Sequence, residues 1–318
     1  MRFEKWQALG NDYLILEREA LPFELTPARI RKLCAGHVGV LADGVLLLSP
    51  PADSEYVADL RIFNPDGSEA ELSGNGAREA TLYLRRRGWT DRDTFAIHTA
   101  AGAIRPTVTG PATARVDMGR ARLRSEDFPT GPADGIGELE LRGAPSSAPA
   151  PSSARWRFRH VWIGNPQCAI GVEDAPALAA LDLRVAGPPI EGHGAFPNRT
   201  NVSWYTELAS APTPRIRARI FERGVGETMS SGTGACGAAV AYLLERGGRA
   251  PQLDGAGRVT VVLDGGELEV EVGTDLRVHL SGWAVPVFEG RLSEEFVKEL
   301  FLIDESVLVA EPETEGAG

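Results

Sequence analysis

Two short glycine-rich segments, one in each half of the chain, constrain the fold more than any other feature. Residues 73–78 read SGNGAR and residues 231–236 read SGTGAC, and a run of helical composition follows each segment. The glycines let the backbone approach a ligand closely, and the start of the following helix presents unpaired N–H groups. The sequence therefore predicts two anion-binding corners led by Ser73 and Ser231. If the two halves face each other, both hydroxyls meet over one bound anion.

Length and composition indicate a two-domain globular protein. The chain has 318 residues, of which 43% are apolar and 24% charged. Its net charge of -11 argues against a general nucleic-acid binder, which would carry a basic face. No apolar run approaches the ~18–20 residues of a membrane helix, and the first residues lack the apolar core of a signal peptide. We therefore predict a cytoplasmic protein without a membrane or nucleic-acid partner.

Neither a metal nor a nucleotide cofactor is expected. The three cysteines, Cys34, Cys168 and Cys236, are far apart and are predicted to be reduced, and the five histidines lack metal-ligand spacing. Residues 232–237 formally match a dinucleotide-binding fingerprint. That motif should follow a strand directly, whereas about ten residues separate it from the strand predicted at 215–222.

The order of predicted elements is similar in the two halves, which suggests duplication. After a hairpin-like start at 3–16, strands are predicted at 45–48, 58–63, within 94–123, at 155–163, 201–207 and 215–222, and within 259–280. Helices are predicted at 27–34, 77–87, 235–245 and 293–302. The expected architecture is two similar α/β domains with a cleft between them.

Composition sets the predicted domain limits. The segment 143–154 is rich in Pro, Ser and Ala and is expected to form a long surface loop. We predict an N-terminal domain at 1–125, a flexible linker or insert at 126–154, and a C-terminal domain at 155–290. A C-terminal helix and an acidic, disordered tail are expected at 291–318.

Polar residues gather at the predicted turns near both corners. A single Asn in a turn usually caps the local backbone, but their joint placement beside two helix starts favours ligand binding. Amides, backbone N–H groups and an arginine suit a small zwitterion such as an amino acid. The candidates are Asn11, Asn64, Gly74, Asn75, Asn165, Asn201, Glu222, Arg223, Gly232 and Thr233.

A series of motifs in the chain resembles the diaminopimelate epimerase family. In order, they are GND at 10–12, IFNPDGSE at 62–69, GNGAR at 74–78, GNP at 164–166, FPNRTN at 196–201, ERGVGET at 222–228 and GTGA at 232–235. The resemblance extends to VFEG at 287–290.

This resemblance implies two pseudo-symmetric α/β domains, each wrapping a mixed sheet around a central helix. It implies an isomerase that interconverts LL- and meso-diaminopimelate, for lysine and peptidoglycan precursors, without pyridoxal phosphate or metal. The ten candidates above correspond to the family's substrate contacts. Proteins with this fold often form dimers, so a homodimer is an expectation of the resemblance alone.

The chain departs from the family pattern at the catalytic positions. Ser73 and Ser231 stand where the family has a thiolate base and a thiol acid, and Gln167 stands where it has a histidine. A serine hydroxyl has a pKa at least ~4 units above that of a thiol, so forming the base costs roughly 5–6 kcal/mol more. Without compensation, the rate falls on the order of 10⁴-fold. Glu222 is the remaining ionisable candidate to take the serine proton.

Three functions stay open at this point. The first is epimerisation of diaminopimelate or another amino acid by Ser73 and Ser231 with assistance. The second is isomerisation or dehydration of another small acid, as in members of the wider superfamily that resemble proline racemases. The third is an inactivated form that binds an amino acid without turnover. Cys236 is not a replacement base, because it lies five residues beyond Ser231 and faces elsewhere on the helix.

Overall fold

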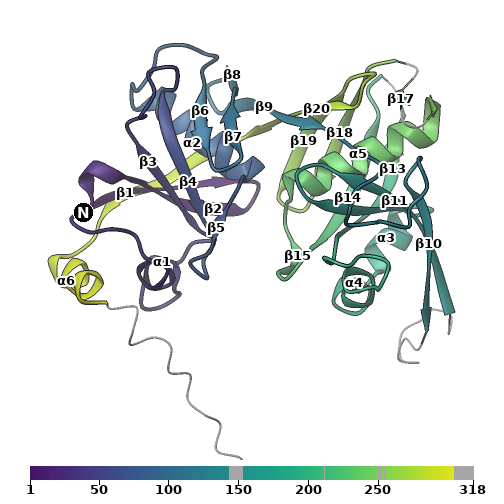
Figure 1. Cartoon of the computed structure of the whole chain (residues 1–318), viewed down its shortest axis with the longest axis horizontal. Helices are drawn as coiled ribbons and strands as arrows, with labels where there is room; N and C mark the ends of the chain where they lie inside the picture. Colours follow the sequence, from purple (N-terminus) through teal and green to yellow (C-terminus); the bar gives the residue numbers. More distant parts are fainter. Residues whose placement is uncertain (143–152, 211, 250–251, 254, 304–318) are drawn as a thin grey trace, which may run out of the picture. The chain divides into compact units, whose positions relative to one another are not determined.

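The computed structural model describes residues 1–142, 153–210, 212–249, 252–253 and 255–303. The chain divides into two compact units (Figure 1). Unit 1 comprises residues 1–107 and 284–318, and unit 2 comprises residues 108–283. Each unit has its own sheet and its own central helix.

The sheet of unit 1 is mixed, in the order β21-β1-β2-β3-β4-β6-β7, with β5 paired to β4. Its strands are β1 (Arg2–Ala8), β2 (Asn11–Glu17), β3 (Val45–Ser49), β4 (Ala58–Phe63), β5 (Glu69–Ala70), β6 (Ile97–Thr99), β7 (Gly102–Ile104) and β21 (Val285–Arg291). The last strand returns from the far end of the chain and pairs with β1, so the two ends of the sequence share one sheet.

The sheet of unit 2 runs in the order β10-β11-β12-β13-β14-β18-β19-β20-β9-β8, with β15 paired to β14. Its strands are β8 (Thr107–Gly110), β9 (Thr113–Arg120), β10 (Ile136–Arg142), β11 (Ser153–Trp162), β12 (Pro166–Gly171), β13 (Asn201–Ala209), β14 (Arg215–Glu222), β15 (Gly226–Thr228), β18 (Gly257–Leu263), β19 (Gly266–Val272) and β20 (Arg277–Trp283). A separate small ribbon joins β16 (Gly248–Arg249) to β17 (Gln252–Leu253).

Both units repeat one pattern of strand pairing. In unit 1 the successive pairs from β1 to β7 are antiparallel, parallel, antiparallel, parallel and antiparallel. The pairs from β11 to β19 in unit 2 follow the same order. A short strand paired to the fourth strand, β5 or β15, precedes the central helix in each unit. The predicted pseudo-symmetric α/β fold is thereby confirmed.

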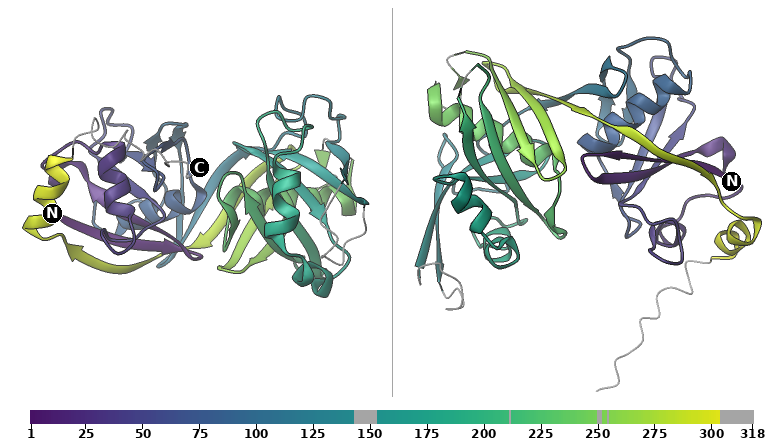
Figure 2. Two further views of the ribbon diagram at one scale, coloured as in Figure 1. Left: turned by 90° about the horizontal axis from the view of Figure 1, so that it is seen from below. Right: turned by 180° about the vertical axis from the view of Figure 1, so that it is seen from behind.

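The central helices are α2 (Gly74–Arg86) and α5 (Gly232–Gly247). Within unit 2, α5 contacts strands from β11 to β14 and from β18 to β20, and Figure 2 shows the strands around it. Within unit 1, α2 packs against β1, β2 and β3. Residues 74–84 of α2 are all buried, so a polar side chain there that lacks a partner is costly.

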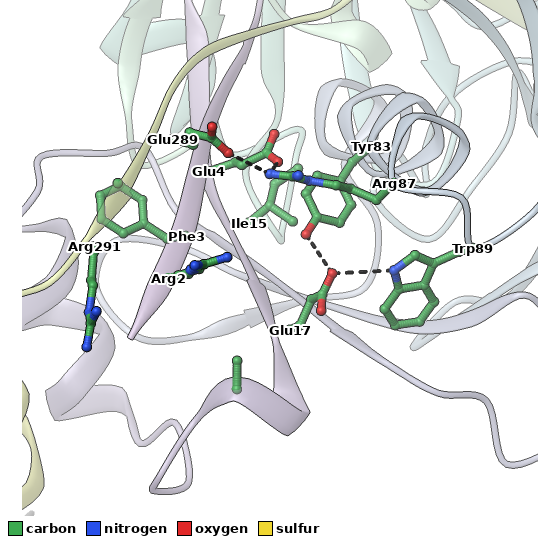
Figure 3. Close-up of a pocket in the computed structure, with 12 residues that line it drawn as sticks. Arg2, Phe3, Glu4, Ile15, Glu17, Tyr83, Arg87, Trp89, Glu289 and Arg291 are labelled. Carbon is green, nitrogen blue, oxygen red and sulfur yellow. Dashed lines mark hydrogen bonds and ion pairs between the residues drawn. The ribbon is translucent and has the colours of Figure 1, made fainter.

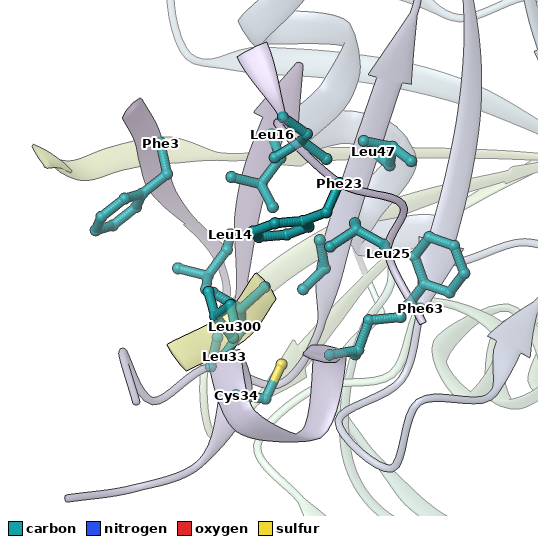
Figure 4. Packing of buried hydrophobic residues seen from close by; sticks show 14 residues of the cluster. Phe3, Leu14, Leu16, Phe23, Leu25, Leu33, Cys34, Leu47, Phe63 and Leu300 are labelled. Atoms are coloured by element: carbon teal, nitrogen blue, oxygen red, sulfur yellow. The ribbon is translucent and has the colours of Figure 1, made fainter. Parts of the chain in front are cut away.

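Each unit also has helices besides its central helix. They are η1 (Arg18–Ala20), α1 (Pro27–Cys34), α3 (Ala175–Ala180), α4 (Leu183–Glu191) and α6 (Glu294–Leu302). Figure 4 shows the unit 1 core, in which Leu300 of α6 and Leu33 of α1 pack with Leu14 and Phe23. Arg29 of α1 also donates from Nε to the Leu300 carbonyl at 2.7 Å. A second apolar core in unit 2 surrounds Trp204 and Phe196.

Most predicted elements match the observed ones closely. The strands at 58–63 and 215–222 have the predicted limits, Thr26 caps α1 with Pro27 at its first position, and Ser293 caps α6. No helix in the part of the chain that the structure describes is both long and apolar enough to cross a membrane.

The compact units divide at other positions than the predicted domain limits of 125, 154 and 290. Strand β9 pairs with β20 and β10 pairs with β11, which places residues 113–120 and 136–142 in the sheet of unit 2. Pairing of β21 with β1 returns residues 285–291 to unit 1. Residues 143–152 of the predicted surface loop and 304–318 of the predicted tail lie outside the described residues, whereas Ser153 and Ala154 begin β11.

Two adjacent charged residues, Arg78 and Glu79, are fully buried on α2. Arg78 donates to the Gly74 carbonyl at 3.0 Å and to Asn75 Oδ1 at 2.6 Å. Neither carboxyl oxygen of Glu79 has a hydrogen-bond partner among the described residues. Burial raises the pKa of Glu79 well above its ordinary value of 4.5, although the charge of Arg78 opposes the shift. Burial therefore favours the protonated form of Glu79 in the folded chain.

We predict that Glu79→Gln stabilises the fold increasingly as the pH rises. Above pH 4.5 the unfolded chain releases a proton that folded Glu79 keeps, so the natural chain loses ~1.4 kcal/mol of unfolding free energy per pH unit until the folded-state pKa is reached. The glutamine has the shape of the protonated acid and no such loss. Urea unfolding of both proteins between pH 4 and pH 8 measures the difference, and a difference that is independent of pH would contradict the prediction.

Candidate active site

The first corner is the N-terminus of α2, where Ser73 is the N-cap residue. Its backbone is extended, and its Oγ accepts a hydrogen bond from the Gly76 N–H at 3.1 Å. A Cβ on Gly76 would lie 3.0 Å from Leu46 Cδ2, so the second glycine lets the helix approach β3. Gly74 and Asn75 form the first turn and are buried. The helix predicted at 77–87 therefore forms, but it begins three residues earlier, at Gly74, with Ser73 as its cap.

The second corner repeats this arrangement at α5. Ser231 Oγ accepts from the Gly234 N–H at 3.3 Å, and the Ser231 carbonyl accepts from Ala235 at 3.0 Å. A Cβ on Gly234 would lie 2.7 Å from Ile220 Cδ1, which explains the second glycine here too. Gly232 and Thr233 begin the helix.

A chain of hydrogen bonds fixes the predicted ligand residues of unit 1. Asn75 Nδ2 donates to Asn11 Oδ1 at 3.1 Å, and Asn11 Nδ2 donates to Asp43 Oδ2 at 2.9 Å. Arg78 approaches Asn75 from the interior, as described above. The two amides that we predicted separately are thus one connected pair, with each oriented by a charged residue.

A tight hairpin turn places Asn11 at the start of β2. The two turn residues, Leu9 and Gly10, have φ angles of 56° and 82°. Two successive left-handed residues match a type I′ turn, which suits Gly10 and is costly for a leucine. Leu9 is fully buried, so packing holds it in this conformation.

In unit 2 a second pair forms between Asn201 and the turn after β14. Asn201 Oδ1 accepts from the Arg223 backbone N–H at 2.8 Å, and Arg223 Nη1 donates to the Asn198 carbonyl at 2.8 Å. Buried Glu191 of α4 accepts from the Gly224 N–H at 2.7 Å. The turn that carries Arg223 is therefore held from two sides.

Glu222 contacts the serine of the second corner directly. Ser231 Oγ donates to Glu222 Oε2 at 3.0 Å, and Thr228 Oγ1 donates to Glu222 Oε1 at 2.7 Å. The short pairing of β14 with β15 brings Thr228 back beside Glu222. A carboxylate therefore lies within proton-transfer distance of a serine hydroxyl.

The remaining two candidates have mainly local partners. Asn64 closes the turn before β5, with its Nδ2 donating to Ser68 Oγ at 2.9 Å. Asn165 lies between β11 and β12 and accepts from Gln167 Nε2 at 2.5 Å. Gln167 thus orients Asn165 and is itself fully buried.

Two of the three cysteines, Cys34 and Cys168, are chemically unsuited to act as bases. All three cysteines are buried. Burial, together with the charges of Asp12 and Asp43, raises the pKa of the Cys34 thiol to about 12, and burial raises that of Cys168 well above its ordinary value. These two thiols remain protonated at neutral pH and cannot act as bases.

Sequence reasoning missed the residues that support the two corners: Tyr13, Asp43, Arg78, Thr228 and Glu191. The most consequential is Tyr13, whose Oη donates to Ser73 Oγ at 3.2 Å across 60 positions of sequence. Aromatic and charged residues on strands or helices are usually packing or surface residues, so their types gave no signal.

A pocket of about 760 Å³ lies elsewhere in unit 1 (Figure 3). Arg87 contacts Glu4 and Glu289 beside it, and Glu17 accepts from Tyr83 Oη at 2.7 Å. None of the described residues lining this pocket is a predicted site residue.

Comparison with known proteins identifies relatives along most of the chain. A family model described as diaminopimelate epimerase matches residues 3–124 and 160–282. A diaminopimelate epimerase of Synechococcus sp. (strain JA-3-3Ab) is 39% identical over 298 residues, covering 92% of this chain and 99% of the relative. One of Pelotomaculum thermopropionicum is 40% identical over 301 residues, covering 91% and 98%.

Solved structures share the fold at lower identity. A phenazine biosynthesis protein of the PhzF family from Bacillus anthracis has a TM-score of 0.63 at 16% identity, covering 92% of this chain and 99% of that one. A hydroxyproline epimerase from Agrobacterium vitis has a TM-score of 0.61 at 17% identity, covering 91% of both chains. At these identities the likeness concerns the fold alone.

We predict that Ser73→Ala lowers the free energy of unfolding by about 1 kcal/mol, because the Gly76 N–H loses its acceptor. Ser73→Thr keeps an oxygen at the cap and should retain most of that stability. Urea denaturation measures both variants, with exchange of the Gly76 amide as a local readout. Equal stability and equal Gly76 protection in the alanine and threonine variants would show that the cap contributes nothing.

Proposed function

The chain belongs to the diaminopimelate epimerase family, and from this premise we propose that it is an isomerase inverting an α-carbon of diaminopimelate in lysine biosynthesis. The observation that carries the proposal is identity of 37–40% to diaminopimelate epimerases over more than nine-tenths of the chain. The two glycine corners lie within the matched residues.

The polar groups of each unit suit an amino-acid ligand. The Asn11–Asn75 pair and the first turn of α2 offer amide and backbone donors to a carboxylate. Asn201, Arg223 and the first turn of α5 offer the same chemistry in unit 2. In the proposed site, Asn64, Asn165, Gly74, Gly232 and Thr233 complete the substrate contacts.

The contact between Ser231 and Glu222 supports proton transfer by a hydroxyl. A free alkoxide costs roughly 5–6 kcal/mol more to form than a thiolate. The Glu222 carboxylate already accepts a hydrogen bond from Ser231 Oγ, with the two oxygens 3.0 Å apart. The hydroxyl proton can therefore move to Glu222 while Ser231 takes the substrate proton, so a free alkoxide never has to form. In this proposal Ser231 abstracts the α-proton with Glu222 as its acceptor, and Ser73 serves the opposite transfer.

The comparisons favour epimerisation over the two alternatives, dehydration or isomerisation of another small acid and binding without turnover. A cytoplasmic location and a homodimeric state complete the proposal. The first agrees with a biosynthetic role on a small amino acid, and the second rests on the resemblance.

We predict that the natural chain incorporates deuterium at the α-carbon of LL-diaminopimelate in D₂O. Glu222→Gln should lower kcat by ~10²–10⁴-fold, because a neutral amide cannot take the Ser231 proton. Glu227→Gln is the matched control: Glu227 lies in the same hairpin but pairs with Arg219, and its loss should leave kcat unchanged. A natural chain that incorporates no deuterium, or equal effects of the two variants, contradicts the proposal.

A further inference from the structure

The two corner serines have opposite hydrogen-bond patterns. A hydroxyl has one proton to donate and two lone pairs that accept. Ser73 Oγ accepts twice, from the Gly76 N–H at 3.1 Å and from Tyr13 Oη at 3.2 Å. Both lone pairs are thereby occupied, and the Ser73 proton is the remaining group that can be passed to a ligand.

At Ser231 the hydroxyl proton is already donated in a hydrogen bond. Ser231 Oγ donates to Glu222 Oε2 at 3.0 Å and accepts only one bond among the described residues, from the Gly234 N–H at 3.3 Å. One lone pair therefore remains to receive a proton. By geometry alone, Ser73 is prepared as an acid and Ser231 as a base.

Tyr13 is built into the first corner. It lies on β2 two residues after Asn11, so both side chains point to the same face of the strand. Asn11 meets Asn75, and Tyr13 meets Ser73, at the same helix start. Only 6% of Tyr13 is exposed, and a Cβ on Gly44 of the neighbouring segment would lie 2.6 Å from its ring. Because Gly44 has no side chain, the Tyr13 ring can pack against it.

From these contacts we infer that Tyr13 is the proton-supplying partner of Ser73, so that the site pairs a Tyr13–Ser73 acid with a Ser231–Glu222 base. The inference rests on the proposed function and extends it. A phenol is a stronger acid than an aliphatic alcohol, so it can replace the proton that Ser73 gives away. Two serine hydroxyls can then replace two thiols, because Ser73 has a more acidic neighbour in Tyr13 and Ser231 has a more basic neighbour in Glu222.

The proton transfers balance without any other reactant. The α-C–H bond breaks, its proton bonds to Ser231 Oγ, and the Ser231 hydroxyl proton moves to Glu222 Oε2. The electron pair left on the α-carbon takes the Ser73 hydroxyl proton from the other side, while the Tyr13 phenol proton moves to Ser73 Oγ. Glu222 has gained one proton and Tyr13 has lost one, and exchange with water or the reverse reaction restores both.

The test is a double-mutant cycle between Tyr13→Phe and Ser73→Cys. With Ser73 present, Tyr13→Phe should lower kcat for inversion by ~10²-fold, with KM changed by less than about 2-fold. A thiol is acidic enough to act without the phenol, so in the Ser73→Cys background the same change should cost less than about 3-fold. Tyr83→Phe removes a comparable buried phenol, which donates to Glu17 at 2.7 Å, and should leave kcat unchanged.

If Tyr13 has a purely structural role, the double-mutant cycle gives a different result. Tyr13→Phe would then cost the same factor in both backgrounds, or would change kcat no more than Tyr83→Phe does, and either result overturns the inference. If Ser73→Cys has no activity, isotope exchange decides: Tyr13→Phe should still exchange the α-proton of one stereoisomer with D₂O while inversion is lost. Equal loss of exchange for both stereoisomers overturns the inference. Failure of the proposed function is distinct, because the natural chain itself would then exchange neither isomer.

Discussion

Both central helices begin at a serine whose hydroxyl oxygen satisfies a backbone N–H group, and the candidate site depends on that bond. The first turn of a helix has N–H groups without intrahelical partners, and α2 and α5 both begin at positions where nearly all residues are buried. The cap therefore fixes the same oxygen that the proposed chemistry uses. Oxygen is a better hydrogen-bond acceptor than sulfur, whereas a thiol ionises more readily. A serine at this position thus stabilises the helix start, but it needs a neighbouring acid or base to transfer its proton.

This help differs between the two corners, although the two units repeat one fold. Both units share one order of strand pairing and one placement of the helix after a short strand, so the capping geometry is repeated. The neighbours of each cap come from different elements. Tyr13 reaches Ser73 from β2, whereas Glu222 reaches Ser231 from the end of β14. The same backbone frame therefore holds a phenol in one unit and a carboxylate in the other.

Local features of the sequence predicted much of this structure. The helices at 27–34 and 293–302, the strands at 58–63 and 215–222 and the two glycine corners depend on residues close in sequence, so they could be predicted directly. Long-range pairing could not: β21 joins β1 across almost the entire chain, and this pairing determines where unit 1 ends. Helix α4 contains Pro188 and Pro189, which normally argue against a helix. The Tyr13–Ser73 and Asp43–Asn11 contacts depend on strand order, which local patterns do not specify.

The central claim is that Ser73 and Ser231 act on one α-carbon of diaminopimelate. A crystal structure of this chain with a substrate analogue bound tests it most directly. The account predicts that both Oγ atoms lie within about 3–3.5 Å of the α-carbon or its hydrogen, as a near-attack geometry requires. An analogue whose α-carbon lies near only one serine, or near neither, would contradict the account.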